Sequence, residues 1–330
     1  MSGSETVSIN ADEDGMRLDR WFRERYPALG HGALQKLLRT GQVRVDGSRA
    51  KANQRIAQGQ EVRVPPMAVH ATDDKPKPPP PSASAADRKL IADLAIYEDE
   101  DLLILNKTPG LAVQGGSKMS RHIDGILAGM GQGEKRPRLV HRLDRETSGV
   151  LAIAKRRTIA ASLGKAFQTR SVRKIYWAVT GGVPDPVQGE IDIDLIKAKG
   201  PKGDRVRAAH KGEADAQRAV TKYSVVDKVA TTAAWVSLKP LTGRQHQLRA
   251  HMAAIGTPIL GDDKYEGDAL TPPVLENRLH LHARRLSFKH PRTGKIVDVT
   301  APLPKHMVDT FAFFGFEVPA SGAVDGDDEA

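Results

Sequence analysis

The stretch RPRLVHRLDRETSGVLAIAKR, residues 136–156, holds the clearest local pattern in the chain. Its polar middle, HRLDRETSG (141–149), lies between apolar residues on both sides, which is typical of a loop that joins two strands. Residues 135–157 contain eight Lys and Arg but two acids. In such positive surroundings we expect Asp144 to stay ionised, ready to act as a nucleophile or base beside a polyanion. An aspartate that pairs with an arginine for structural reasons is the alternative.

The overall composition is typical of a protein that binds a polyanion. Among 330 residues, 50 are Lys or Arg and 40 are Asp or Glu, so the formal net charge is +10. Such a charge favours nucleic acid or an anionic membrane surface as partner. The chain has no cysteine, which excludes disulfides, thiolate zinc sites, iron–sulfur clusters and a cysteine nucleophile. With no secretory signal and no run of about 18 apolar residues, we expect a cytoplasmic protein without membrane spans.

Changes in composition divide the chain into five parts. Residues 67–87 include a run of four prolines and predict an extended linker. The linker separates a basic segment, 16–66, with eleven Lys and Arg against four acids, from a body, 88–318, that is long enough to bury a core. We expect the polar residues 1–15 and the acidic tail 319–330 to be disordered, because the tail has too few apolar side chains to offset the entropy of ordering.

The basic segment predicts two short helices followed by strands. Apolar residues recur at helical spacing in MRLDRWFRERYP (16–27) and ALQKLLRTG (33–41), and QVRVDG (42–47) alternates before an Asp-Gly turn. This pattern resembles the S4 RNA-binding domain, although Gly30 precedes the second helix where that family often has a hydroxyl residue. We expect outward basic side chains to contact the RNA backbone, namely those of Arg20, Lys36, Arg39 and Arg44.

The HRLDRETSG segment (141–149) matches the HRLDxxTSG signature of the RluA/RluC/RluD family of pseudouridine synthases at each fixed position. Other segments of the body are similar to motifs of this family in the same order: ILNKTPGLAVQGG (104–116), RKIYWAVTGG (173–182), LTGRQHQLRAHMAAIGTPILGDDKY (241–265) and LHLHARRLSFKHPRTGKIVDVTAPLP (279–304). The resemblance covers essentially the whole body. It implies an α+β fold on a mixed, largely antiparallel sheet with flanking helices, and an active loop at a cleft across the middle of the sheet.

The resemblance also implies three catalytic residues. Asp144 would be the essential carboxylate, attacking the ribose anomeric carbon or the pyrimidine ring, or helping to remove a sugar proton; these three routes stay open. Tyr176 would stack on the flipped base and could serve the proton shift at ring carbon five. Arg249 would pair with Asp144 and hold it in position. From the residues alone, Tyr176 in IYWAV could equally be an ordinary strand residue.

Three further residues are expected to contact the substrate. By the resemblance, Arg142 would enter the space left by the flipped uridine, and Leu248 would pack beneath the uracil. His246 precedes Arg249 by three residues, so a helix here would place both on one face and direct them to one site. His246 and His251 are five apart, which differs from the spacing of HExxH metal pairs, and we expect no metal.

The expected partner is large-subunit ribosomal RNA, since the chain has the S4-like segment and its VRVPPM (62–67) and AVQGGS (112–117) segments are most similar to the RluC branch of the family. Chemistry on a base in structured RNA requires extrusion of the nucleotide, a stacking surface and a group that fills the gap. We expect such an isomerisation to need no cofactor, and the protein to be a monomer that does not bind a membrane.

Two other functions remain open from the sequence. A non-catalytic ribosome-assembly factor on the same fold should have lost active-loop residues, and no such loss is seen. A hydrolase using His141 and Asp144 is the weaker alternative, because GxSxG is absent. The basic segment KAKGPKGDRVRAAHK (197–211) shows no apolar periodicity, and we expect a mobile loop that contacts RNA or is simply solvated.

Overall fold

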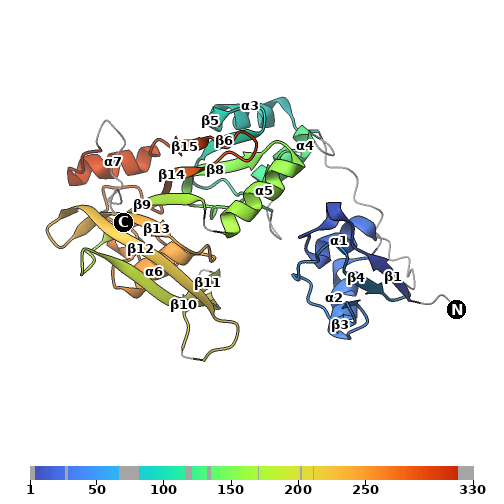
Figure 1. The fold of residues 1–330 in the computed structure, drawn as a ribbon. Helices are drawn as coiled ribbons and strands as arrows, with labels where there is room; N and C mark the ends of the chain where they lie inside the picture. The colour runs from blue at the N-terminus through green and yellow to red at the C-terminus, as the bar shows by residue number, and fades with distance from the viewer. Residues whose placement is uncertain are drawn as a thin grey trace. The chain divides into compact units, whose positions relative to one another are not determined.

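The chain forms two units, Met1–Pro79 and Pro80–Ala330, whose boundary falls inside the proline-rich segment (Figure 1). In the ranges described below, no helix is both long and apolar enough to cross a membrane. The computed structural model describes residues 4–26, 29–66, 82–115, 121–131, 135–169, 171–200, 203–210 and 212–318.

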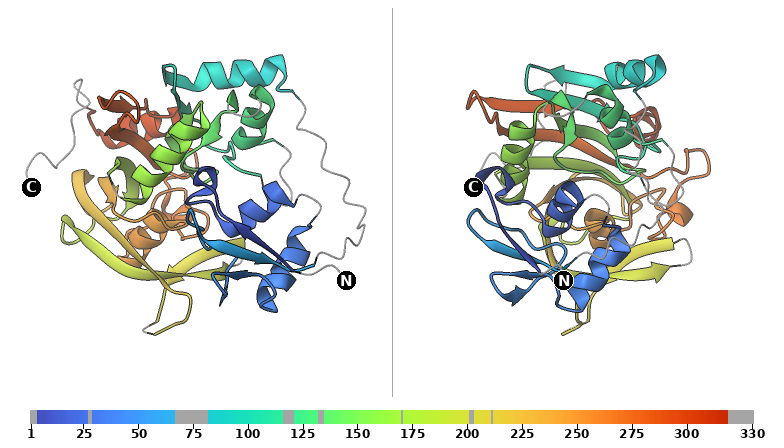
Figure 2. Two further views of the ribbon diagram at one scale, coloured as in Figure 1. Left: turned by 45° about the vertical axis from the view of Figure 1, so that its right-hand side comes forward. Right: turned by 90° about the vertical axis from the view of Figure 1, so that its right-hand side faces the viewer.

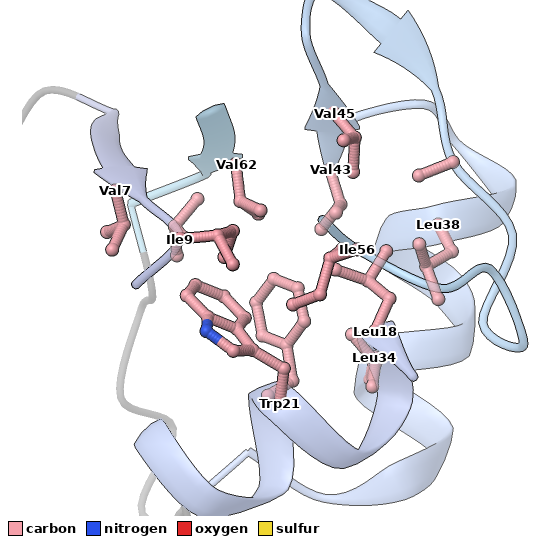
Figure 3. Packing of buried hydrophobic residues seen from close by; sticks show 13 residues of the cluster. Val7, Ile9, Leu18, Trp21, Leu34, Leu38, Val43, Val45, Ile56 and Val62 are labelled. Atoms are coloured by element: carbon pink, nitrogen blue, oxygen red, sulfur yellow. The ribbon is translucent and has the colours of Figure 1, made fainter. Parts of the chain in front are cut away.

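The first unit packs two helices against a four-stranded sheet in the order β1-β4-β2-β3, with antiparallel neighbours throughout. Leu18, Trp21 and Phe22 of the first helix are buried in one core with Leu34 and Leu38 of the second, so both predicted helices are confirmed (Figure 3). In chain order the elements are β1 (Glu5–Ser8), η1 (Ala11–Glu13), α1 (Leu18–Arg25), α2 (His31–Arg39), β2 (Arg44–Val45), β3 (Ser48–Arg49) and β4 (Glu61–Val64).

The prediction that residues 1–15 are disordered was wrong for residues 4–15; residues 1–3 lie outside the described residues. Strand β1 pairs with β4 in antiparallel register, with Val7 opposite Val62. Val7 and Ile9 are buried in the core of the first unit (Figure 3). Two apolar residues among acidic neighbours give little sign of a strand in the sequence. The strand forms because β4 offers a sheet edge with unpaired backbone groups and an apolar surface beneath it.

The linker is shorter than predicted from the composition of residues 67–87. Helix α3 (Ala85–Leu94) begins inside this range. Ser84 caps the helix, because its Oγ accepts a hydrogen bond from the backbone N–H of Asp87 at 3.1 Å. The small residues that follow the prolines therefore cap and begin the first helix of the second unit. The earlier part of the linker and the predicted tail 319–330 lie outside the described residues.

The second unit is built on an 11-stranded sheet whose main path is β11-β10-β12-β13-β9-β14-β8-β6-β5 (Figures 1 and 2). Strands β14 and β8 are parallel and the other neighbours are antiparallel, so the mixed, largely antiparallel sheet is confirmed. After α3 the elements are β5 (Ala95–Glu98), β6 (Leu102–Lys107), α4 (Ile123–Met130), β7 (Arg138–Leu139), β8 (Ser148–Ala154), α5 (Arg157–Gln168), β9 (Arg173–Gly181), β10 (Gln188–Gly200), β11 (Gly203–Ala208), β12 (Gln217–Val229), β13 (Ala233–Pro240), α6 (Gln247–Ala254), η3 (Asp268–Leu270), β14 (Leu281–Lys289), β15 (Ile296–Thr300) and α7 (Lys305–Phe314).

Helices cover both faces of this sheet. In β6, Ile104 is buried in a core with α5, whereas the neighbouring Leu105 is buried in a core with α3 and α4. Burial on both faces explains why β6 and β8 are continuous apolar runs in the sequence. In the other half of the sheet, Val236 of β13 packs with α6, and the adjacent Trp235 packs with Phe311 of α7. The loop between β7 and β8 leads into β8, which lies beside β14 in this sheet.

The basic segment 197–211 forms a β-hairpin, so the prediction of a mobile loop was wrong for its described residues; residues 201, 202 and 211 lie outside them. Strands β10 and β11 pair in antiparallel register, with Lys197 opposite Val206. Val206 is 4 % exposed and shares a core with Leu195 and with residues of α6. Val206 is the one buried residue of β11, which is too little to produce a visible period in the sequence.

Candidate active site

The C-terminal end of the HRLDRETSG loop is fixed to strand β14. Ser148 and Gly149 begin β8 and pair in parallel with His282 and Ala283. Gly149 has a φ of 107°, and a Cβ at this position would lie 2.2 Å from the carbonyl oxygen of Ala283. Only glycine permits this approach. The Oγ of Ser148 lies 2.8 Å from Nδ1 of His282, so the Ser-Gly pair of the motif joins the loop to the neighbouring strand.

Lys107, at the end of β6, anchors the loop from its other side. Its side chain is 0 % exposed, and Nζ donates hydrogen bonds to the carbonyl oxygens of Thr108, Leu111 and Arg145 at 2.8–3.0 Å. Burial lowers the pKa of Lys107 to about 7. The sequence analysis gave Lys107 no role. A lysine at the end of an apolar strand nevertheless indicates a buried charge that forms specific hydrogen bonds.

Asp144 lies at a cavity of about 630 Å³. The cavity is lined by the loop, by Tyr176 of β9 and by the segment 240–249, which leads into α6. A volume of this size suits a nucleotide-sized ligand. The structure brings together at this cavity all six residues that the sequence placed in the site: Asp144, Tyr176, Arg249, Arg142, Leu248 and His246.

Two side chains at the N-terminal end of α6 approach the carboxylate. Nη1 of Arg249 and Nε2 of His246 each lie 3.9 Å from Oδ2 of Asp144. His246 is the N-cap residue of α6 and has a φ of 51°, a backbone conformation that is unusual for residues other than glycine. The loop arginine Arg145 donates instead to the carbonyl oxygen of Gly110. The guanidinium that faces Asp144 therefore comes from a distant segment and not from the arginine-rich loop.

The tightest partner of Arg249 is Asp262, which the sequence analysis missed. Two hydrogen bonds join them, from Nη2 to Oδ1 at 2.6 Å and from Nε to Oδ2 at 2.7 Å. The side chains are 4 % and 0 % exposed. Burial opposes the charged guanidinium, but the hydrogen bonds to Asp262 raise the pKa of Arg249. The bidentate pair holds the guanidinium so that its remaining nitrogen, Nη1, points towards Asp144.

Tyr176 provides an aromatic surface beside the carboxylate. It lies on β9, opposite Leu238 of β13 and Ala283 of β14. Its half-buried ring packs at the edge of an apolar cluster that contains Leu248. Burial, and then the charge of Asp144, raise the pKa of Tyr176 above its usual value. The phenol therefore keeps its proton at neutral pH, and its ring and Leu248 form an apolar part of the cavity wall.

His141 is held within the sheet and is unsuited to act as a base. Its Nε2 accepts a hydrogen bond from the backbone N–H of Ala152 at 2.8 Å, and its ring stacks on Phe167 with centroids 4.6 Å apart. Burial lowers the pKa of His141 to about 3. A hydrolase that uses His141 to activate a nucleophile would need this nitrogen free, so the geometry disfavours that alternative.

The rim of the cavity is polar. Arg142 is exposed, and its Nη1 lies 3.4 Å from Oε1 of Gln114. This contact is long and leaves the guanidinium accessible to a ligand. In the described part of the chain, no three His, Cys, Asp or Glu side chains form a group that could hold a metal ion.

The residues expected to contact RNA through the S4-like segment belong to the first unit. Lys36 and Arg39 are exposed on α2. Arg20 is also exposed but forms an ion pair with Glu24 at 2.9 Å. Nη1 of Arg44 donates to the carbonyl oxygen of the turn residue Gly47 at 2.7 Å. Lys36 and Arg39 are thus exposed together on α2, whereas Arg20 and Arg44 each contact a neighbour in the first unit.

Comparison with known proteins identifies the family. A family model described as RNA pseudouridylate synthase matches residues 101–254, a range that holds the loop, β9 and α6. Over 303 residues the chain is 35 % identical to the ribosomal large subunit pseudouridine synthase C of Escherichia coli O6:H1, covering 90 % of this chain and 92 % of that protein. This chain belongs to the RNA pseudouridylate synthase family. The family predicted from the loop and its companion motifs is thereby confirmed.

Other members of the RNA pseudouridylate synthase family agree in sequence and in fold. The Rickettsia bellii protein named ribosomal large subunit pseudouridine synthase C is 35 % identical over 298 residues, covering 88 % of this chain and 95 % of that protein. The solved structure of human RNA pseudouridylate synthase domain containing 4 matches with a TM-score of 0.57 and 30 % identity, covering 70 % of this chain and 96 % of that chain. The predicted α+β pseudouridine synthase fold is confirmed.

Proposed function

We propose that this protein converts uridine to pseudouridine at specific positions of large-subunit ribosomal RNA, with Asp144 as the essential carboxylate. The observation that carries the proposal is the convergence of Asp144, Arg249 and Tyr176 on one nucleotide-sized cavity. The relatives named ribosomal large subunit pseudouridine synthase C support the choice of RNA. This protein would thus be an RNA isomerase of the RluC type.

The geometry suits this isomerisation. The bond from ribose carbon one to the base nitrogen breaks, and the same sugar carbon forms a new bond to ring carbon five. The proton of carbon five is lost and the freed ring nitrogen takes up a proton, so the product is an isomer. Asp144 would attack the sugar or the ring, or remove a sugar proton. Arg249 would keep this carboxylate ionised and oriented, and Tyr176 with Leu248 would hold the detached base in plane. Arg142 at the rim would fill the space that the flipped uridine leaves.

We further propose that the first unit is an S4-like RNA-binding module. Two helices on a small sheet, with Lys36 and Arg39 exposed on α2, suit contact with a phosphate backbone. Arg20 and Arg44 would add to this contact once their intramolecular partners release them. We infer that the enzyme works as a monomer in the cytoplasm.

The proposal is tested by tritium release from a large-subunit ribosomal RNA transcript labelled at uridine carbon five. We expect release by the wild type and background release by Asp144→Asn, because the substitution removes the charge with little change in volume. Asp144 makes no contact with Arg249 or His246 shorter than 3.9 Å, so the variant should keep its melting temperature. Glu146→Gln is the matched control, since it removes the other acid of the same loop and should release tritium normally.

Other results would contradict the proposal. Release by Asp144→Asn at the wild-type rate would show that this carboxylate is not essential. If neither protein releases tritium from naked or precursor RNA that both bind, the assembly-factor alternative is favoured. If Asp144→Asn unfolds while Glu146→Gln does not, the aspartate has a structural role.

A further inference from the structure

Tyr265 contacts both groups that approach the candidate catalytic carboxylate. It is 8 % exposed and is not among the described residues that line the cavity. Its Oη lies 3.2 Å from Nδ1 of His246, and its ring centroid lies 5.3 Å from Cζ of Arg249. The backbone N–H of Val206 in β11 donates to the same Oη at 2.9 Å. One phenol therefore connects the edge strand to two neighbours of Asp144.

The directions of these hydrogen bonds determine the tautomer of His246. The N–H of Val206 can only donate, so it occupies one lone pair of the Tyr265 oxygen. Burial raises the pKa of Tyr265 to about 12, so the phenol keeps its proton, and Nδ1 of His246 is the acceptor within reach. The ring proton of neutral His246 then sits on Nε2 and points at Asp144. The opposite tautomer would set a lone pair against the carboxylate, which is unfavourable.

The segment that carries Tyr265 also holds β11 in place. β11 is the edge strand of the sheet, so its outward N–H and C=O groups have no neighbouring strand. Nζ of Lys264 donates to the carbonyl oxygen of Asp204 at 2.9 Å, and the backbone N–H of Lys264 donates to Oδ1 of Asp262 at 3.0 Å. The same short segment thus satisfies the edge strand and supplies the partner of Arg249.

We propose that Tyr265 is a positioning residue for the reaction: it fixes the ring orientation and tautomer of His246, aligns Arg249, and ties both to strand β11. The proposal rests on the proposed function, because it assigns to His246 a proton directed at the catalytic carboxylate. Strand β10 of the same hairpin presents Lys197 and Lys199 to solvent. A displacement of the hairpin by a bound polyanion would therefore reach His246 through two successive hydrogen bonds of the Tyr265 hydroxyl.

The test removes the phenol oxygen with Tyr265→Phe and reads the tautomer directly. In full-length protein labelled with nitrogen-15 histidine, two-bond proton–nitrogen spectra show which ring nitrogen of His246 is protonated; His246→Asn identifies the signal. We expect the wild type at pH 7 to carry its proton on Nε2, and Tyr265→Phe to show a mixture. In single-turnover tritium release at saturating enzyme, we expect the variant to be about tenfold slower, the effect of losing one ordinary hydrogen bond, with unchanged RNA affinity.

Tyr223→Phe is the matched control. Tyr223 is also 8 % exposed and donates one hydrogen bond from Oη, to the carbonyl oxygen of Pro186 at 2.9 Å, away from the cavity. It should lose similar stability and leave the spectrum of His246 and the rate unchanged. A wild-type spectrum with the proton on Nδ1, or with both nitrogens protonated, would refute the proposal even if Tyr265→Phe fails to fold. A normal rate and spectrum in a folded Tyr265→Phe would do the same. Absence of tritium release from the wild type would instead refute the proposed function.

Discussion

Acidification should destabilise the second unit, because two histidines of the LHLHA segment are buried in neutral form. His280 and His282 are each 0 % exposed. His282 is held between Oγ of Ser148 at 2.8 Å and the carbonyl oxygen of Ala301 at 3.2 Å. Burial lowers the pKa of His282 to about 3 and that of His280 to about 4. Neither ring takes up a proton at mildly acidic pH while it stays buried, so protonation requires unfolding around the ring.

The sign and size of the effect follow from linkage. Between pH 6.5 and about 4, the unfolded chain binds a proton at each histidine and the folded chain does not, so the free energy of unfolding falls as the pH falls. At pH 5 the gap to the ordinary pKa of 6.5 is about 1.5 units, or about 2 kcal/mol for each ring. The two rings together lose about 4 kcal/mol, a large part of the 5–15 kcal/mol that is typical for a domain.

The loss is measured by urea unfolding at pH 7.5 and pH 5. Trp21→Phe confines tryptophan fluorescence to the second unit, where Trp177 and Trp235 are buried. We expect His282→Gln to remove about 2 kcal/mol of the pH-dependent loss, to which His141 and His251 of the same unit also contribute because burial lowers their pKa values. His210→Gln, at an exposed histidine of the same unit, should leave the pH-dependent loss of unfolding free energy unchanged. Equal unfolding free energies at the two pH values, or an undiminished loss in His282→Gln, would refute the reasoning.

Two further substitutions test the contacts that build the site. Asp262→Asn should lower the free energy of unfolding by about 2–4 kcal/mol and slow tritium release at saturating RNA. The loss is smaller than for a fully uncompensated buried charge, because the amide oxygen still accepts a hydrogen bond from Arg249. Urea unfolding and single-turnover rates measure both effects, and unchanged values would show that Asp262 does not support Arg249. Gly149→Ala should separate β8 from β14, because its Cβ would lie 2.2 Å from the Ala283 oxygen, and thermal melting should show a loss of at least several degrees. A wild-type melting temperature for Gly149→Ala would mean that the strands can shift without cost.

The sequence predicted those features that depend on neighbouring residues. The apolar runs around HRLDRETSG predicted a loop between strands, which the structure shows as β7 and β8. Helical spacing located α1, α2 and α6, and the order of the motifs indicated the family and its mixed sheet. These predictions succeed because regular secondary structure repeats over a few residues, and burial on one or both faces leaves that period in the sequence.

The tertiary structure decided which charged and polar side chains meet. Asp262, Lys107 and Tyr265 all lie in segments that the motifs include, yet their sequence positions do not reveal that they contact Arg249, the HRLDRETSG loop and His246, respectively. The strand Glu5–Ser8 likewise depends on a sheet edge formed more than fifty residues later. Such contacts join segments far apart in the chain, and a hydrogen bond is fixed by distances and angles that only the packed fold sets. The sequence by itself therefore determined the family, the mixed sheet and six residues of the cavity. Packing determined how the side chains of those residues are oriented.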